Sequence, residues 1–189
     1  MSVVELKDEN GALDRANRVL AGIPGGSISA AHAALERAGQ RARTEASRAV
    51  SQKYIVKVGD FNKNVTYKAT EKSSGNSVTS VSLNFSGRVI RLIEFETKVG
   101  QNGRVTTHVK RDSAPKQLDH AFARPVFGQA GVFERTTTKR FPVRQLYGPA
   151  IPQMLDNEQV KEMMEKVAVE TFQQRMEHEM LRVLNGWGK

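Results

Sequence analysis

An apolar stripe, composed mostly of alanine, in the N-terminal third of the chain restricts the folds that the chain can adopt. The stripe recurs at steps of three and four residues from Ile28 to about Gln52, which is the spacing of one face of an α-helix. Because alanine side chains are small, another backbone can approach such a face closely. We therefore predict a long helix that lies flat on a sheet or on a neighbouring subunit. The stripe comprises Ile28, Ala31, Leu35, Ala38, Ala42, Ala46, Ala49 and Val50.

Two further helices are predicted near the ends of the chain. A short one is expected from about Gly11 to Leu20, because residues 22–26, GIPGG, break helical hydrogen bonding. A long amphipathic one is expected to begin at Asp156 or Asn157, with Asp156 and Gln159 spaced as in a capping box, and to end at Gly186. Its stripe suits core packing or an adaptable contact surface. The stripe comprises Val160, Met163, Met164, Val167, Phe172, Met176, Met180 and Leu184.

Between these helices the pattern changes to the alternation of β-strands. Turn signals occur at Gly75-Asn76 and at residues 100–103, where Asn102-Gly103 favours a hairpin because both residues tolerate a positive φ. The sequence therefore predicts an α+β fold, with an antiparallel sheet region flanked by the alanine-rich helix and the C-terminal amphipathic helix. The strands are expected at residues 65–67, 78–85, 89–95, 105–109, 121–124 and 132–136.

Residues 140–154 are predicted to be an extended linker between the sheet region and the last helix. Pro142, Pro149 and Pro152 disfavour helix both at and before their own positions. A stiff connector with exposed apolar side chains is suited to holding a partner.

Composition narrows the function classes. The chain has 189 residues and no cysteine, which excludes disulfides, thiolate metal sites and a cysteine nucleophile. No stretch approaches the roughly 18 apolar residues that span a bilayer, and no basic segment followed by an apolar one marks a secretory signal. We therefore expect a protein that is neither membrane-bound nor exported.

Charge is the strongest compositional signal. The formal net charge is +9, which favours acidic partners. Residues 86–145 hold twelve Lys and Arg against five Asp and Glu, whereas residues 156–184 hold four against seven. A basic middle and an acidic end suit head-to-tail contact between copies of one chain, although an ordinary solvated surface can look the same.

The sequence offers little for catalysis. The four histidines have no pair at the spacing that places two imidazoles on one metal, and neither a phosphate-binding loop nor a Gly-x-Ser-x-Gly motif occurs. Glu94 and Glu96 are expected on one strand face, where paired carboxylates can act as acid and base, but solvated strand charges explain them better. We expect no enzyme activity, no cofactor, no metal site and no catalytic residue.

Non-specific nucleic-acid binding is the alternative function. Basic residues of the middle segment can neutralise phosphates, while zinc-finger spacing and the aromatic motif of RNA-recognition domains are absent. The sequence therefore favours backbone contacts over base readout. The side chains expected to face DNA or an acidic partner are Arg88, Arg91, Arg104, Lys110, Arg111, Arg124, Arg135, Lys139, Arg140 and Arg144.

The segment Lys139 to Met154 reads KRFPVRQLYGPAIPQM. It resembles the phage minor tail protein Z family and related tail-completion proteins. These carry a basic residue, then Leu/Tyr/Phe-Pro-Ile/Val, and then Leu-Tyr-Gly-Pro-Ser-Ile/Val-Pro-Gln-Met. Ala150 stands where that pattern has serine. The alanine-rich helix, His120-Ala121-Phe122-Ala123, the run GVFER at residues 131–135 and the last helix follow in the same order as in the family. The resemblance covers most of the chain after residue 26.

The resemblance implies a structural virion protein, assembled in the host cytoplasm, that completes the head-proximal end of the tail at the head–tail joint. Its expected partners are itself, in a hexameric ring, and the tail terminator, tail tube and head–tail connector proteins, with packaged DNA as a further one. It also implies an N-terminal extension over residues 1–26 and a single tail-completion domain over residues 27–189. The side chains expected to make subunit or neck contacts are Phe141, Pro142, Val143, Leu146, Tyr147, Pro149, Ile151 and Met154.

Overall fold

A computed structural model of the chain describes residues 2–6, 11–126 and 128–186. These residues form two compact units. Unit 1 takes in the described residues within 1–46, 66–86 and 155–189, and unit 2 takes in those within 47–65 and 87–154. The helices are α1 (Ala12–Val19), α2 (Gly26–Lys53), α3 (Val58–Asn64), α4 (Ile151–Leu155), α5 (Glu158–Leu184) and the 3-10 helix η1 (Leu92–Glu94).

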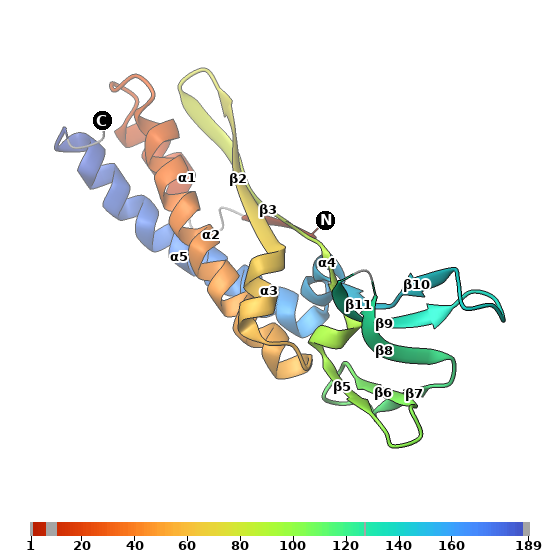
Figure 1. Ribbon diagram of the computed structural model, residues 1–189. Helices are drawn as coiled ribbons and strands as arrows, with labels where there is room; N and C mark the ends of the chain where they lie inside the picture. The colour runs from red at the N-terminus through yellow and green to blue at the C-terminus, as the bar shows by residue number, and fades with distance from the viewer. Residues whose placement is uncertain (1, 7–10, 127, 187–189) are drawn as a thin grey trace. The chain divides into compact units, whose positions relative to one another are not determined.

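The strands form four small sheets (Figure 1). Unit 1 holds the sheet of order β1-β3-β2, and unit 2 holds the sheets β10-β9-β8, β11-β4 and β5-β6-β7. Long helices together with small antiparallel sheets confirm the predicted α+β class. The strands are β1 (Ser2–Leu6), β2 (Val65–Ser74), β3 (Ser77–Gly87), β4 (Val89–Arg91), β5 (Glu96–Val99), β6 (Val105–His108), β7 (Lys116–Leu118), β8 (Ala121–Val126), β9 (Gln129–Arg135), β10 (Val143–Gln145) and β11 (Tyr147–Ala150).

In unit 1 the alanine-rich helix α2 packs against the β2–β3 hairpin. At Gly39 a Cβ atom would collide with the ring of Tyr67 in β2 and would lie 3.1 Å from a methyl carbon of Leu83 in β3. The Tyr67 hydroxyl donates to a carboxylate oxygen of Glu36 at 3.2 Å, and burial together with this carboxylate raises the pKa of Tyr67. The prediction that a sheet lies closely against this helix is confirmed, although the tight contact is at Gly39, which is not part of the predicted stripe.

The short helix α1 buries most of its apolar side chains in unit 1 and also makes polar contacts there. The side-chain amide of Asn17 donates to the Val78 carbonyl at 2.9 Å and accepts from the Val78 amide at 3.0 Å, so it continues the pairing of β3. Arg15 forms an ion pair with Glu177 of α5 at 3.2 Å. Residues 12–19 are therefore packed parts of unit 1. The domain boundary expected after residue 26 stays a prediction.

Unit 2 has a core of its own, built from several short elements. Phe61 of α3 is fully buried, although the segment's two asparagines and glycine are weak helix formers. Its burial explains a helix that the sequence pattern did not predict. The other buried apolar side chains among the described residues of unit 2 are Ala49, Val50, Tyr54, Val56, Val65, Ile90, Leu92, Phe95, Val105, Val132, Phe133, Ile151 and Met154.

The predicted linker over residues 140–154 is wrong. Within it, β10 pairs with β9, β11 pairs with β4, and α4 follows at once. Pro149 is tolerated because the register of β11 shifts between Tyr147 and Ala150, where the ladder needs no donor from this residue. The capping box is also wrong, because the residue before α5 is Asn157 and its side chain makes no capping hydrogen bond. Among the described helices none is both long and apolar enough to cross a membrane.

Candidate interaction surfaces

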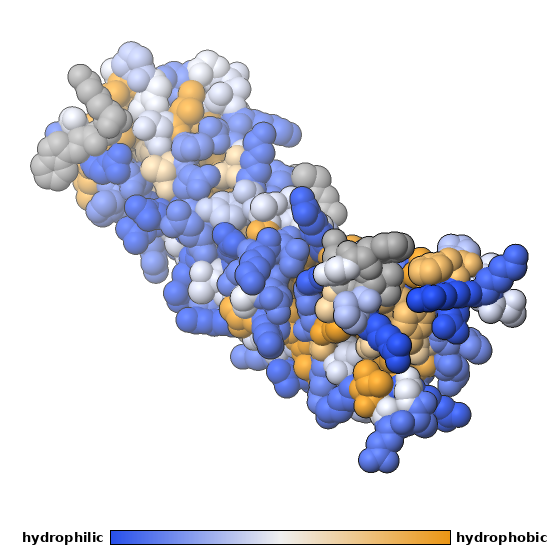
Figure 2. Space-filling model, in the orientation of Figure 1, coloured by the Kyte–Doolittle hydropathy of each residue, from blue (hydrophilic) through white to orange (hydrophobic). Residues whose placement is uncertain are grey.

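Unit 2 carries a groove of about 1130 Å³ over the β8–β9–β10 sheet. Its floor comes from β8 and β9, and its rim from residues 136–142, the loop that joins β9 to β10. In Figure 2, hydrophobic side chains reach the surface over this sheet, with strongly hydrophilic ones beside them. Three arginines line the groove, together with Phe122, Phe141 and the threonines at 136–138.

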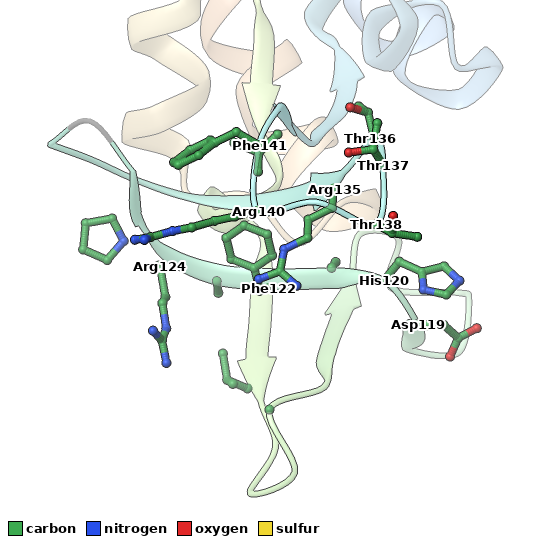
Figure 3. A pocket seen from close by; sticks show the side chains of 16 residues that line it. Asp119, His120, Phe122, Arg124, Arg135, Thr136, Thr137, Thr138, Arg140 and Phe141 are labelled. Carbon is green, nitrogen blue, oxygen red and sulfur yellow. The ribbon is translucent and has the colours of Figure 1, made fainter.

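Strand geometry brings these side chains together. Phe122 and Arg124 point to the same face of β8 because they are two residues apart. Phe133 of β9 lies opposite Phe122, with ring centroids 6.1 Å apart, and Arg135 follows two residues later on that face. The guanidinium of Arg135 lies 5.6 Å from the centre of the Phe122 ring. Figure 3 shows Arg135 beside Phe122, with Arg140 reaching across the groove.

The structure separates the ten predicted basic residues into paired and unpaired ones, all of them in unit 2. Arg91 forms an ion pair with Glu94 at 2.6 Å, and Arg144 forms one with Glu134 at 2.9 Å. Arg111 donates to the Ser51 carbonyl at 2.9 Å. Within the described part of the chain the others have no carboxylate at ion-pair distance. These are Arg88, Arg104, Lys110, Arg124, Arg135, Lys139 and Arg140.

The predicted contact residues of the segment 141–154 do not share one surface. Ile151 and Met154 have no exposed surface, so we assign them to the core of unit 2 and no longer to a partner surface. Phe141 is 49% exposed and lines the groove, where Arg140 lies 5.7 Å from its ring centre. Pro142 is exposed, whereas Val143, Leu146 and Pro149 are half-buried.

Tyr147 belongs to a second surface, on the two-stranded β4–β11 sheet. It lies opposite Arg91 of β4 and is 49% exposed. Val89, two residues from Arg91, points to the same side and is 47% exposed, whereas Ile90 between them is fully buried. We call Val89 and Tyr147 the β4–β11 face. Sequence reasoning named Tyr147 and missed Val89, although the alternation at residues 89–91 was a usable signal.

The expectation that Glu94 and Glu96 share one strand face is wrong, because Glu94 is in η1 and Glu96 is in β5. Each of them has its own cation, as expected for charges that do not work as a pair. Glu94 binds Arg91, whereas Glu96 lies 2.7 Å from the Lys98 ammonium and 3.2 Å from a ring nitrogen of His108. The hydrogen bond from Lys98, then that from His108, lowers the pKa of Glu96. A general acid needs the opposite shift. Across the described residues no group of three His, Asp or Glu side chains could hold a metal ion.

A family model described as prophage minor tail protein Z (GPZ) matches residues 11–186. The chain belongs to this family. No curated protein and no solved structure matches it. As a prophage minor tail protein Z, it is a structural component of a phage tail and so of the virion. The match begins at residue 11 and therefore includes α1, whereas the resemblance of the sequence motifs covers the chain only after residue 26.

Proposed function

We propose that the chain completes the head-proximal end of the tail and contributes to the head–tail joint around the DNA channel, without a catalytic step. The observation that carries this proposal is the family match over residues 11–186, which makes the chain a minor tail protein. Two surfaces of unit 2 support the finer role. The groove offers positive charge, and the β4–β11 face offers exposed apolar area.

The charge distribution supports association between copies. Residues 86–145 carry an excess of seven positive charges, and residues 156–184, mostly α5, carry an excess of three negative ones. Opposite charges on two segments of one chain favour a head-to-tail arrangement, which closes into a ring when the rotation between copies permits it. Six copies would match the symmetry expected of a tail. The tail terminator, the tail tube and the head–tail connector are the proposed neighbours.

Size-exclusion chromatography with light scattering tests the association. The purified full-length chain should elute as a multimer, with six copies expected, and the multimer should weaken as salt is raised because screening reduces charge attraction. A chain that stays monomeric at all salt concentrations, alone and with the tail terminator, would contradict the ring. A monomer that is absent from virions but binds duplex DNA would support the second candidate function, non-specific nucleic-acid binding, which the basic groove favours.

A further inference from the structure

We propose that the groove over β8, β9 and residues 136–142 binds the sugar–phosphate backbone of duplex DNA without reading its sequence. The inference rests on the proposed function, under which packaged DNA passes close to this chain. It assigns to three side chains, Arg124, Arg135 and Arg140, a ligand of a definite chemical class.

The positive charge of the groove is not compensated by acidic side chains. Among the described residues none of these three arginines has a carboxylate at ion-pair distance, and Asp119 is the acidic residue in the groove lining. Lys139, next to Arg140 in the loop, is likewise exposed. By contrast, Arg144 on the neighbouring strand is neutralised by Glu134, directly opposite it in the β9–β10 register. Positive charge is therefore concentrated in the groove rather than spread evenly over the sheet.

Two of the guanidinium groups lie over aromatic rings. Arg135 lies over Phe122 and Arg140 lies over Phe141, at 5.6 and 5.7 Å from the ring centres. A ring face attracts a cation without using its N–H groups, so the donors of both arginines stay available for a ligand. The planar guanidinium matches the oxygens of a phosphate better than a flexible ammonium does. Figure 3 shows Arg140 crossing the groove between Phe141 and Phe122.

The remaining side chains of the groove also suit a phosphate backbone. The Thr137 hydroxyl oxygen accepts the Lys139 amide at 3.2 Å, which leaves its own O–H free to donate to a phosphate oxygen. Among the described residues that line the groove none is an asparagine or a glutamine, the side chains that pair with adenine. The lining therefore offers donors for the phosphate backbone and no side chain that would read adenine.

DNA fits the groove better than the acidic segment of a second copy. In residues 156–184, mostly α5, the acidic residues are interspersed with Lys161, Lys166, Arg175 and Arg182. The excess of three negative charges suits contact with cations outside the groove, but it is spread more thinly than the charge of DNA. Duplex DNA carries one phosphate per about 1.7 Å of its axis, with no cation interspersed. Three unpaired arginines in one concave surface match the denser charge.

Fluorescence anisotropy of a short labelled duplex, titrated with the full-length chain between about 50 and 200 mM salt, tests the proposal. The logarithm of the affinity should fall linearly with the logarithm of the salt concentration, equally for two unrelated sequences. The variant Arg124→Gln/Arg135→Gln/Arg140→Gln should make this negative slope shallower. Its magnitude should fall by about 2.7, because each lost phosphate contact contributes about 0.9. The control variant Arg91→Gln/Arg144→Gln removes two paired cations and should leave the slope unchanged. Circular dichroism confirms the fold of both.

Three results would overturn the groove assignment: no binding at low salt, an unchanged slope in the triple variant, or equal losses in both variants. If the triple variant fails to join heads and tails although the parent chain binds no duplex, the groove takes an acidic protein instead of DNA. The proposed function fails separately. It fails when particles lacking the chain have normal joints, whatever the anisotropy shows.

Discussion

A chain carrying Val89→Ser and Tyr147→Ser should stay folded and associate with its neighbours about a hundredfold more weakly than the parent chain. Both side chains are about half exposed on the β4–β11 face, so their loss opens no cavity in unit 2. An interfacial tyrosine contributes about 2 kcal/mol when it is truncated, and burial of the remaining valine surface contributes about 1 kcal/mol. Together these amount to roughly two powers of ten in the dissociation constant.

Analytical ultracentrifugation measures the association, and plaque titre on a complemented deletion of the gene measures its consequence. The matched control is Val58→Ser, because Val58 is 42% exposed in the same unit but belongs to α3 and not to β4 or β11. The control should behave as the parent chain does. Parent-like association and titre in the double variant would remove the β4–β11 face from the proposed contacts.

Gly87→Ala should destabilise the chain by about 3 kcal/mol, a value typical of severe overpacking. A Cβ atom on Gly87 would lie 2.5 Å from the Ile151 Cβ and 2.6 Å from the backbone oxygen of Asn64. Neither atom is the end of a flexible side chain, so the backbone of unit 2 has to move. The Asn64 oxygen also accepts the Arg88 amide at 3.1 Å, and that hydrogen bond would be disturbed by the same movement.

Urea unfolding followed by circular dichroism measures the change as a lower transition midpoint. Gly59→Ala is the control, because no heavy atom lies within 4 Å of the added Cβ and the residue is in α3. It should leave the stability within about 1 kcal/mol of the parent, on the stabilising side, since alanine favours helix over glycine. Equal midpoints for the two alanine variants would show that the contact between residue 87 and Ile151 is not tight.

The helices were predictable because their signals are local. The alanine stripe predicted both α2 and the close approach of a sheet, which occurs at Gly39 and Tyr67. Helix α3 was not predictable in the same way, since its stability comes from burying Phe61 among residues distant in the sequence. The prolines of residues 140–154 predicted a linker because proline disfavours regular structure. In the structure this segment forms β10 and β11, which pair with β9 and β4 in two sheets.

The candidate surfaces were predictable in composition but not in arrangement. The sequence alone identifies the ten cations but not their partners. The pairing of Arg144 with Glu134 depends on the β9–β10 register. The contact of Arg111 with Ser51 joins residues 60 positions apart. Ile151 was named as a contact residue because it is apolar and follows a proline-rich run. Ile151, the first residue of α4, is buried because it packs against Gly87, which is distant in the sequence.

Imaging of virions by electron microscopy, with and without this chain, tests the central claim most directly. Particles from a prophage that lacks the gene should contain filled heads and full-length tails that are unjoined or malformed at the head-proximal end, and a label on the chain in parent particles should mark that end. Infectious particles with intact joints in its absence, or a label elsewhere on the virion, would contradict the claim.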